Sequence, residues 1–71
     1  MERNRYQFFM CNKRTTKKEL IYEGWHTEGD MVTMAAGILF GLHRFRPAAY
    51  VLVYLCKEDG STELMHECRW L

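Results

Sequence analysis

The chain has 71 residues and a formal net charge of +1, and 48% of its residues are hydrophobic, with aromatic residues at 14%. This apolar content excludes an intrinsically disordered chain. A chain of this length forms one domain, near the lower limit at which a core is stable without disulfides, a metal or a partner subunit. We therefore expect residues 1–71 to form a single small domain, for which self-association is one route to stability.

Three cysteines, Cys11, Cys56 and Cys68, are spread along the chain without a CxxC pair. The N-terminal residues lack the apolar run of a signal peptide. We therefore interpret the cysteines as reduced thiols and expect a cytoplasmic location. The longest apolar run, residues 34–42, is about half of the ~20 residues that a membrane-spanning helix needs, so no membrane partner is expected.

The first part of the chain predicts a β-hairpin. Residues 5–11 predict a strand that is rich in aromatic residues, in which Tyr6, Phe8 and Met10 alternate with Gln7, Phe9 and Cys11. Residues 12–18 form a polar, basic loop. Residues 19–25 predict a second strand with Leu20 and Tyr22 on the same face. The two strands are close enough in the sequence to pair in an antiparallel sense.

A helix is predicted to follow this hairpin. Thr27 or Asp30 can accept hydrogen bonds from the first N–H groups of a helix over residues 31–45, and Pro47 marks its end. Placing residues 100° apart gives one apolar stripe that can cover a sheet. The stripe consists of Met31, Met34, Ala35, Ile38, Leu42 and Phe45, flanked by Val32 and Leu39.

The last part of the chain predicts a second hairpin. Strands over residues 50–56 and 62–70 are expected to be joined by a two-residue type I′ turn at Asp59 and Gly60. In this register, each face of the hairpin has its own set of cross-strand pairs. The face toward the helix would hold Val51, Val53 and Leu55 opposite Cys68, His66 and Leu64. The other would hold Tyr50, Leu52, Tyr54 and Cys56 opposite Arg69, Glu67, Met65 and Glu63.

These elements predict an α+β domain with the order β-β-α-β-β. Its four-stranded, mainly antiparallel sheet would carry one helix packed on one face.

The side of the helix opposite the stripe is unusual for a solvated surface. It combines one aromatic residue, Phe40, with two glycines, Gly37 and Gly41, that each cost about 1 kcal/mol relative to alanine. Small residues four positions apart allow another backbone to approach closely. We interpret this side as an association surface, with cover by another segment of the same chain as the alternative.

No motif selects an activity, so the favoured function is a non-enzymatic protein-interaction module. Such a module acts as an adaptor, inhibitor or regulator, here as a homodimer or bound to a protein partner. The predicted interface consists of Thr33, Ala36, Gly37, Phe40, Gly41 and Arg44 on the helix with Tyr50 and Tyr54 on the sheet.

Nucleic-acid binding is the alternative function. Residues 1–18 hold six basic groups against one acidic group, a net charge of +5, whereas residues 19–71 hold four against eight, a net charge of −4. Aromatic side chains on the first strand could stack with bases. The basic residues that would contact phosphates are Arg3, Arg5, Lys13, Arg14, Lys17 and Lys18.

Cys56, His66 and Cys68 are the residues closest to a metal-binding pattern. Structural zinc sites show two tight ligand pairs, and here there is one, with Cys56 expected on the opposite face of the sheet. No cysteine follows a turn that would activate it, and no glycine-rich phosphate loop is present. We therefore expect no catalytic residues, no metal, no cofactor and no small-molecule substrate.

Overall fold

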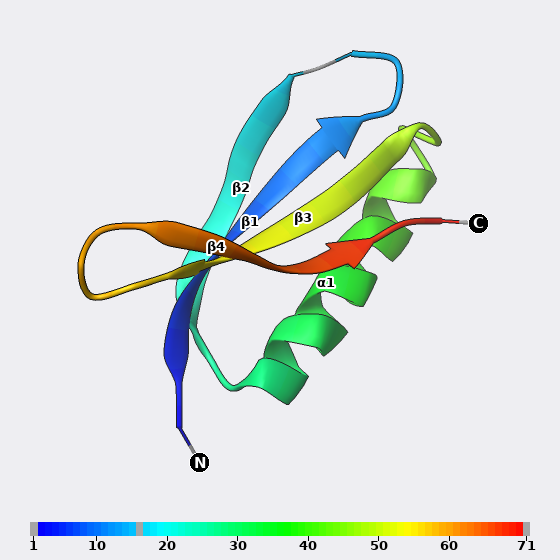
Figure 1. Ribbon diagram of the computed structural model, residues 1–71. Helices are drawn as coiled ribbons and strands as arrows, with labels where there is room; N and C mark the ends of the chain where they lie inside the picture. Colours follow the sequence, from blue (N-terminus) through cyan, green and yellow to red (C-terminus); the bar gives the residue numbers. More distant parts are fainter. Residues whose placement is uncertain (1, 16, 71) are drawn as a thin grey trace.

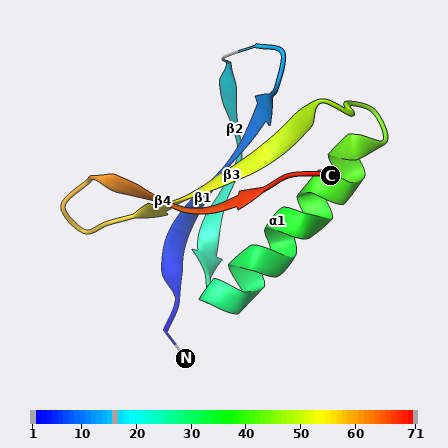
Figure 2. The ribbon, with the colours of Figure 1, turned by 45° about the vertical axis from the view of Figure 1, so that its right-hand side comes forward.

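The structure is a computed structural model that describes residues 2–15 and 17–70, and it confirms the β-β-α-β-β order (Figure 1). The strands form one antiparallel sheet in the order β2-β1-β3-β4. Helix α1 lies across one face of this sheet (Figures 1 and 2). The elements are β1 (Asn4–Asn12), β2 (Lys18–His26), α1 (Glu28–His43), β3 (Ala49–Cys56) and β4 (Thr62–Cys68).

Strands β1 and β3 occupy the centre of the sheet, and they contribute all of its fully buried side chains. The edge strand β2 is exposed along most of its length, and so is β4. The strand order follows from the apolar content of each strand. A central strand is shielded from solvent on both edges, whereas an edge strand keeps one edge in water.

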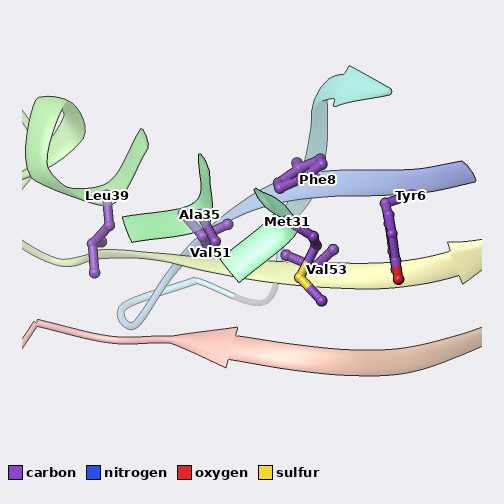
Figure 3. Close-up of a cluster of buried hydrophobic side chains, with 7 residues drawn as sticks. All are labelled: Tyr6, Phe8, Met31, Ala35, Leu39, Val51 and Val53. Atoms are coloured by element: carbon purple, nitrogen blue, oxygen red, sulfur yellow. The ribbon is translucent and has the colours of Figure 1, made fainter. Parts of the chain in front are cut away.

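The core lies between α1 and the two central strands (Figure 3). Met31, Ala35 and Leu39, spaced four residues apart, pack on the strands, with Met34, Ile38 and Leu42 at the sides. This confirms most of the predicted stripe, with Leu39 at its centre instead of its flank. The strand residues of the core are Tyr6, Phe8, Val51 and Val53.

The predicted burial of Phe45 is wrong, because its side chain is 84% exposed. Helix α1 ends at His43, and the N–H groups of Phe45 and Arg46 both donate to the carbonyl of Leu42, at 3.0 and 2.7 Å. This tight turn takes Phe45 out of the helical repeat and away from the sheet. Of the two predicted capping residues, Thr27 is the N-cap, because its Oγ1 accepts from the Asp30 N–H. The helix therefore begins at Glu28, three residues before the predicted start.

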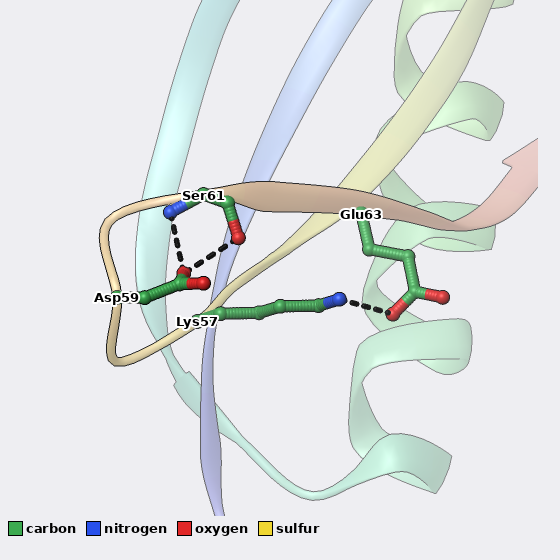
Figure 4. A network of polar contacts seen from close by, with 4 residues as sticks. All are labelled: Lys57, Asp59, Ser61 and Glu63. Carbon is green, nitrogen blue, oxygen red and sulfur yellow. Dashed lines mark hydrogen bonds and ion pairs between the residues drawn. The ribbon is translucent and has the colours of Figure 1, made fainter.

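The β3–β4 turn differs from the predicted two-residue type I′ turn. Gly60 N–H donates to the Lys57 carbonyl (3.1 Å) and Lys57 N–H to the Ser61 carbonyl (2.9 Å), so residues 58–60 form the loop. Gly60 has a φ of 89°, which makes it the left-handed residue of a type I turn with a glycine bulge. Asp59 accepts two bonds from Ser61, and Lys57 pairs with Glu63 at 3.4 Å (Figure 4).

A bulge at Met65 divides the register of the second hairpin. Val51 lies opposite Cys68 and Val53 opposite His66, as predicted, but beyond the bulge Tyr54 lies opposite Leu64. The predicted pairing of Leu55 with Leu64 is therefore wrong, because the extra residue transfers Leu64 to the face away from the helix.

A second bulge has the same effect in the first hairpin. Ile21 is the extra residue, because Phe8 lies opposite Tyr22 and Phe9 opposite Leu20. Leu20 and Tyr22 therefore lie on opposite faces, contrary to the prediction. Tyr22 packs on Phe8 on the helix side, with ring centroids 5.4 Å apart.

Candidate interaction surfaces

The sheet has one face that α1 does not cover, here called the open sheet face. Alternation along the strands and the observed register define its members. Among the described residues, no helix or strand lies over it (Figure 2). Its apolar and aromatic residues are Leu20, Trp25, Phe9, Tyr50, Leu52, Tyr54 and Leu64.

Aromatic rings and cations are organised together on the open sheet face. Phe9 and Tyr54 meet edge to face, with centroids 5.4 Å apart. The Lys18 Nζ lies 4.9 Å from the Phe9 ring centroid and 4.6 Å from that of Tyr54. The guanidinium of Arg69 lies 4.3 Å from the centroid of Tyr50. The two tyrosines of the predicted interface are thus half-buried beneath flexible cationic side chains.

Three large apolar side chains at the edges of this face have no such cover. Trp25 is 64% exposed, Leu64 51% and Leu20 48%. Single exposed apolar residues are common on proteins, but several on one sheet face are typical of an interaction site. The two bulges strengthen this feature, because they turn Leu20 and Leu64 toward the open sheet face.

The outer face of α1 is the second candidate surface. All six of its predicted interface residues are exposed: Thr33, Ala36, Gly37, Phe40, Gly41 and Arg44. A methyl group added at Gly37 or Gly41 would meet no atom of the described neighbours within 4 Å. Within the described chain, packing therefore does not require either glycine.

The C-terminal segment partly covers this helix face. Trp70 stacks on His43 with ring centroids 4.2 Å apart and an interplanar angle of 15°, and its centroid lies 5.9 Å from that of Phe40. Phe40 still remains 62% exposed. Cover by the same chain, the alternative considered above, thus occurs at one edge of the helix and leaves most of Phe40 in solvent.

The structure does not bring the six predicted basic residues together. Arg5 and Lys13 are separated by the length of β1, about 26 Å at the rise of a strand. Arg5 also forms an ion pair with Glu23, at 3.4 Å between Nε and Oε1. Arg3 and Arg5 thus lie at one end of the sheet, and Lys13, Arg14, Lys17 and Lys18 lie at the other.

The cysteines do not assemble into one site. Cys11 is buried on the open-face side of β1, and Cys68 packs against the core on the helix side. Burial raises the pKa of both thiols, which disfavours the reactive thiolate. Cys56 lies on the open sheet face, away from Cys68. Nowhere in residues 2–15 and 17–70 do three His, Cys, Asp or Glu side chains gather as metal ligands.

None of the described helices is long and apolar enough to cross a membrane. Comparison of the chain with protein-family models, curated proteins and solved structures finds no match. The physical properties of the two surfaces therefore carry the functional argument. The contacts of Trp70 with α1 and of Lys18 with Tyr54 join residues distant in sequence, and no local pattern signals them.

Proposed function

We propose that this protein is a non-enzymatic interaction module that self-associates through the open sheet face. The observation that carries the proposal is that α1 covers one face of the central strands, whereas the other face of β3 is also apolar and aromatic, with Phe9 beside it on β1. About half of each of the side chains of Leu20, Leu64 and Trp25 is still exposed, so burying the rest would contribute about 1–2 kcal/mol each. Such a gain is large for a domain whose core nets about 3–5 kcal/mol.

The dimensions of the sheet are compatible with a dimer interface. The two longest extents of the molecule are 33 and 23 Å. A face of this size is of the order of the ~800 Å² that each partner buries in a standard interface. The sheet is thus large enough for a specific contact, provided that most of the open sheet face takes part.

The charges on the open sheet face favour a second copy of the chain as the partner. Arg5, Lys18 and Arg69 are interspersed with Glu23 and Glu67, and two ion pairs already join members of this set. A face with a single sign of charge would repel its own copy, whereas this one is nearly neutral. The three free thiols are consistent with the proposed cytoplasmic setting. The same proposal includes a role for this protein as an adaptor, inhibitor or regulator of a larger partner.

The test is the solution mass, measured by light scattering over a range of concentrations. The wild type should be a dimer, and the double variant Leu20→Glu/Leu64→Glu should be a monomer with an unchanged circular dichroism spectrum. Phe45→Glu is the matched control, because it introduces a charge at an exposed apolar residue away from the sheet. A wild type that is monomeric at every concentration would contradict the proposal.

A further variant distinguishes the two candidate surfaces. Phe40→Glu places the same charge on the outer face of α1, where the sequence predicts the interface. If this variant dissociates the dimer and the Leu20/Leu64 variant does not, the interface lies on the helix. The open sheet face would then be excluded as the dimer contact.

A further inference from the structure

A hollow of about 200 Å³ lies between the β1–β2 loop and the segment that leads from α1 into β3. Lys17, Asn12 and Thr15 line it on the loop side, and Arg46 lines it on the other. Arg46 is 29 residues from Lys17 in the sequence, and only the sheet order β2-β1-β3 brings the two segments together.

Hydrogen bonds hold the two walls of the hollow together. The Lys13 N–H donates to the carbonyl of Ala48 at 2.9 Å and so joins the loop to the start of β3. Within the loop, the Arg14 N–H donates to the Asn12 Oδ1 at 2.8 Å. The side chains of Lys13 and Arg14 therefore project from a backbone with fixed anchor points, which reduces the entropy lost when they bind a ligand.

The cations around the hollow lack the carboxylate partners that other cations of the molecule have. Ion pairs within the described residues involve Arg5, Lys57 and Arg69, and none involves Lys13, Arg14, Lys17 or Arg46. The Arg46 Nη1 contacts the thioether of Met10 at 3.4 Å, a weak acceptor that leaves the remaining guanidinium donors for a ligand.

The lining of the hollow includes one carboxylate, Glu19, against Lys17 and Arg46, so its net charge is +1. With Lys13 and Arg14 on the adjacent loop, four cations surround the hollow, and Lys18 is a fifth at this end of the sheet. Together they give this end of the sheet a positive potential that would attract an anion.

We infer that this hollow binds a phosphate group, and that the phosphate belongs to the backbone of a single-stranded nucleic acid. A guanidinium fork, an ammonium group, a hydroxyl and an amide are the donors that recognise phosphate in proteins. The hollow is smaller than the 300–1,000 Å³ typical of small-molecule sites, which suits one phosphate group. Lys13 and Arg14 outside it would contact successive phosphates, which favours a polymer over a single phosphate.

The proposed site differs from the one predicted from the sequence. It leaves out Arg3 and Arg5, which lie at the other end of β1, and it includes Arg46. The site is independent of the proposed dimer, since its residues lie at one end of the sheet instead of on the open sheet face.

The test is the anisotropy of a fluorescent 15-mer of thymidine, titrated with wild type and two double variants at 50 and 200 mM salt. Lys17→Gln/Arg46→Gln should weaken binding at least tenfold at 50 mM. It should also make the salt dependence shallower by about 1.4 in log–log slope, at ~0.7 per lost phosphate contact. Arg3→Gln/Lys57→Gln removes the same charge from the other end and should change affinity less than twofold.

Two further titrations, with inorganic phosphate and with adenosine monophosphate, identify the source of the phosphate. If these ligands change the chemical shifts of Lys17 and Arg46 but the oligonucleotide does not bind, the hollow is a phosphate site. Its ligand is then a small phosphate compound and not a nucleic acid. Equal weakening by the two double variants would overturn the site, since binding would then reflect net charge alone. Absence of binding by all three ligands would overturn it too.

Discussion

The two faces of the sheet are made by the same strands, yet they differ in what covers them. On the helix side, Phe8 and Val53 are fully buried beneath α1. On the open sheet face, Phe9 and Tyr54 are half-buried and lie beneath the side chain of Lys18. The comparison shows that apolar alternation along β1 and β3 does not identify the core by itself, because both faces of these strands carry apolar residues.

The kind of cover also differs. A helix is held by its own hydrogen bonds and by a row of buried residues, so removing it means unfolding the domain. A lysine side chain over an aromatic ring contributes about 0.5–1 kcal/mol at an exposed site and can rotate away. The open sheet face is therefore the one that a partner can reach without disrupting the fold.

The two faces can be compared by truncating a phenylalanine on each, and the larger loss of stability is expected on the helix side. Phe8→Ala should destabilise the domain by about 3–5 kcal/mol, because it leaves a cavity beneath α1. A core of this size nets about as much, so this variant should be largely unfolded at 25 °C. Urea denaturation followed by circular dichroism measures the effect.

Phe9→Ala is the matched variant on the open sheet face. Its side chain is half-buried, so the free energy of unfolding of the monomer should fall by about 1 kcal/mol. The dimer should weaken more than the monomer fold does. Equal losses of monomer stability for Phe8→Ala and Phe9→Ala would show that the two faces do not differ as the structure indicates.

The next effect concerns the helix, whose outer face is partly covered by the C-terminal segment. Trp70→Ala should reduce stability by about 1 kcal/mol through loss of the stacking on His43 and the contact with Phe40. Thermal unfolding measures the loss. Phe45→Ala is the control, because Phe45 is 84% exposed and lies away from the open sheet face, so its loss should change stability little. A larger loss for Phe45→Ala would contradict the role of Trp70.

Glycine substitutions on α1 test whether the outer helix face has a partner. Gly37→Ala should stabilise the monomer by up to about 1 kcal/mol, because a methyl group there meets no described neighbour. If a second backbone approaches Gly37 in a dimer, the same variant should weaken association instead. Melting temperature and solution mass, measured together, separate the two results.

The sequence predicted the elements and the helix stripe because these depend on local periodicity. Met31, Ala35 and Leu39 are all on one side of a helix whatever the sheet does. The faces of Leu20 and Leu64 could not be predicted, since each depends on a one-residue bulge, at Ile21 or at Met65, that no residue type marks. The Asp59-Gly60 pair suits both a two-residue and a three-residue loop, and local sequence does not choose between them.

The candidate sites were less predictable than the fold because they depend on strand order. The approach of Arg46 to Lys17 requires β1 to lie between β2 and β3, and the contact of Trp70 with α1 requires β4 at the edge beside the helix. Neither condition follows from the periodicity of any single segment. Charge along the sequence indicated a basic first segment, but the strand length separates Arg3 and Arg5 from the loop.

The smallest expected effect tests the cover of the open sheet face directly. Lys18→Gln removes the cation from above Phe9 and Tyr54 and should destabilise the monomer by about 0.5–1 kcal/mol. Lys17→Gln is the matched control, because it removes the same charge from the neighbouring exposed residue and should leave stability unchanged. Urea denaturation at low and high salt measures both variants.

If Lys18 only screens the rings from a partner, its loss should also strengthen the dimer, since a second copy would no longer have to displace it. A variant that is less stable and also more monomeric would instead make Lys18 part of the contact between the two copies.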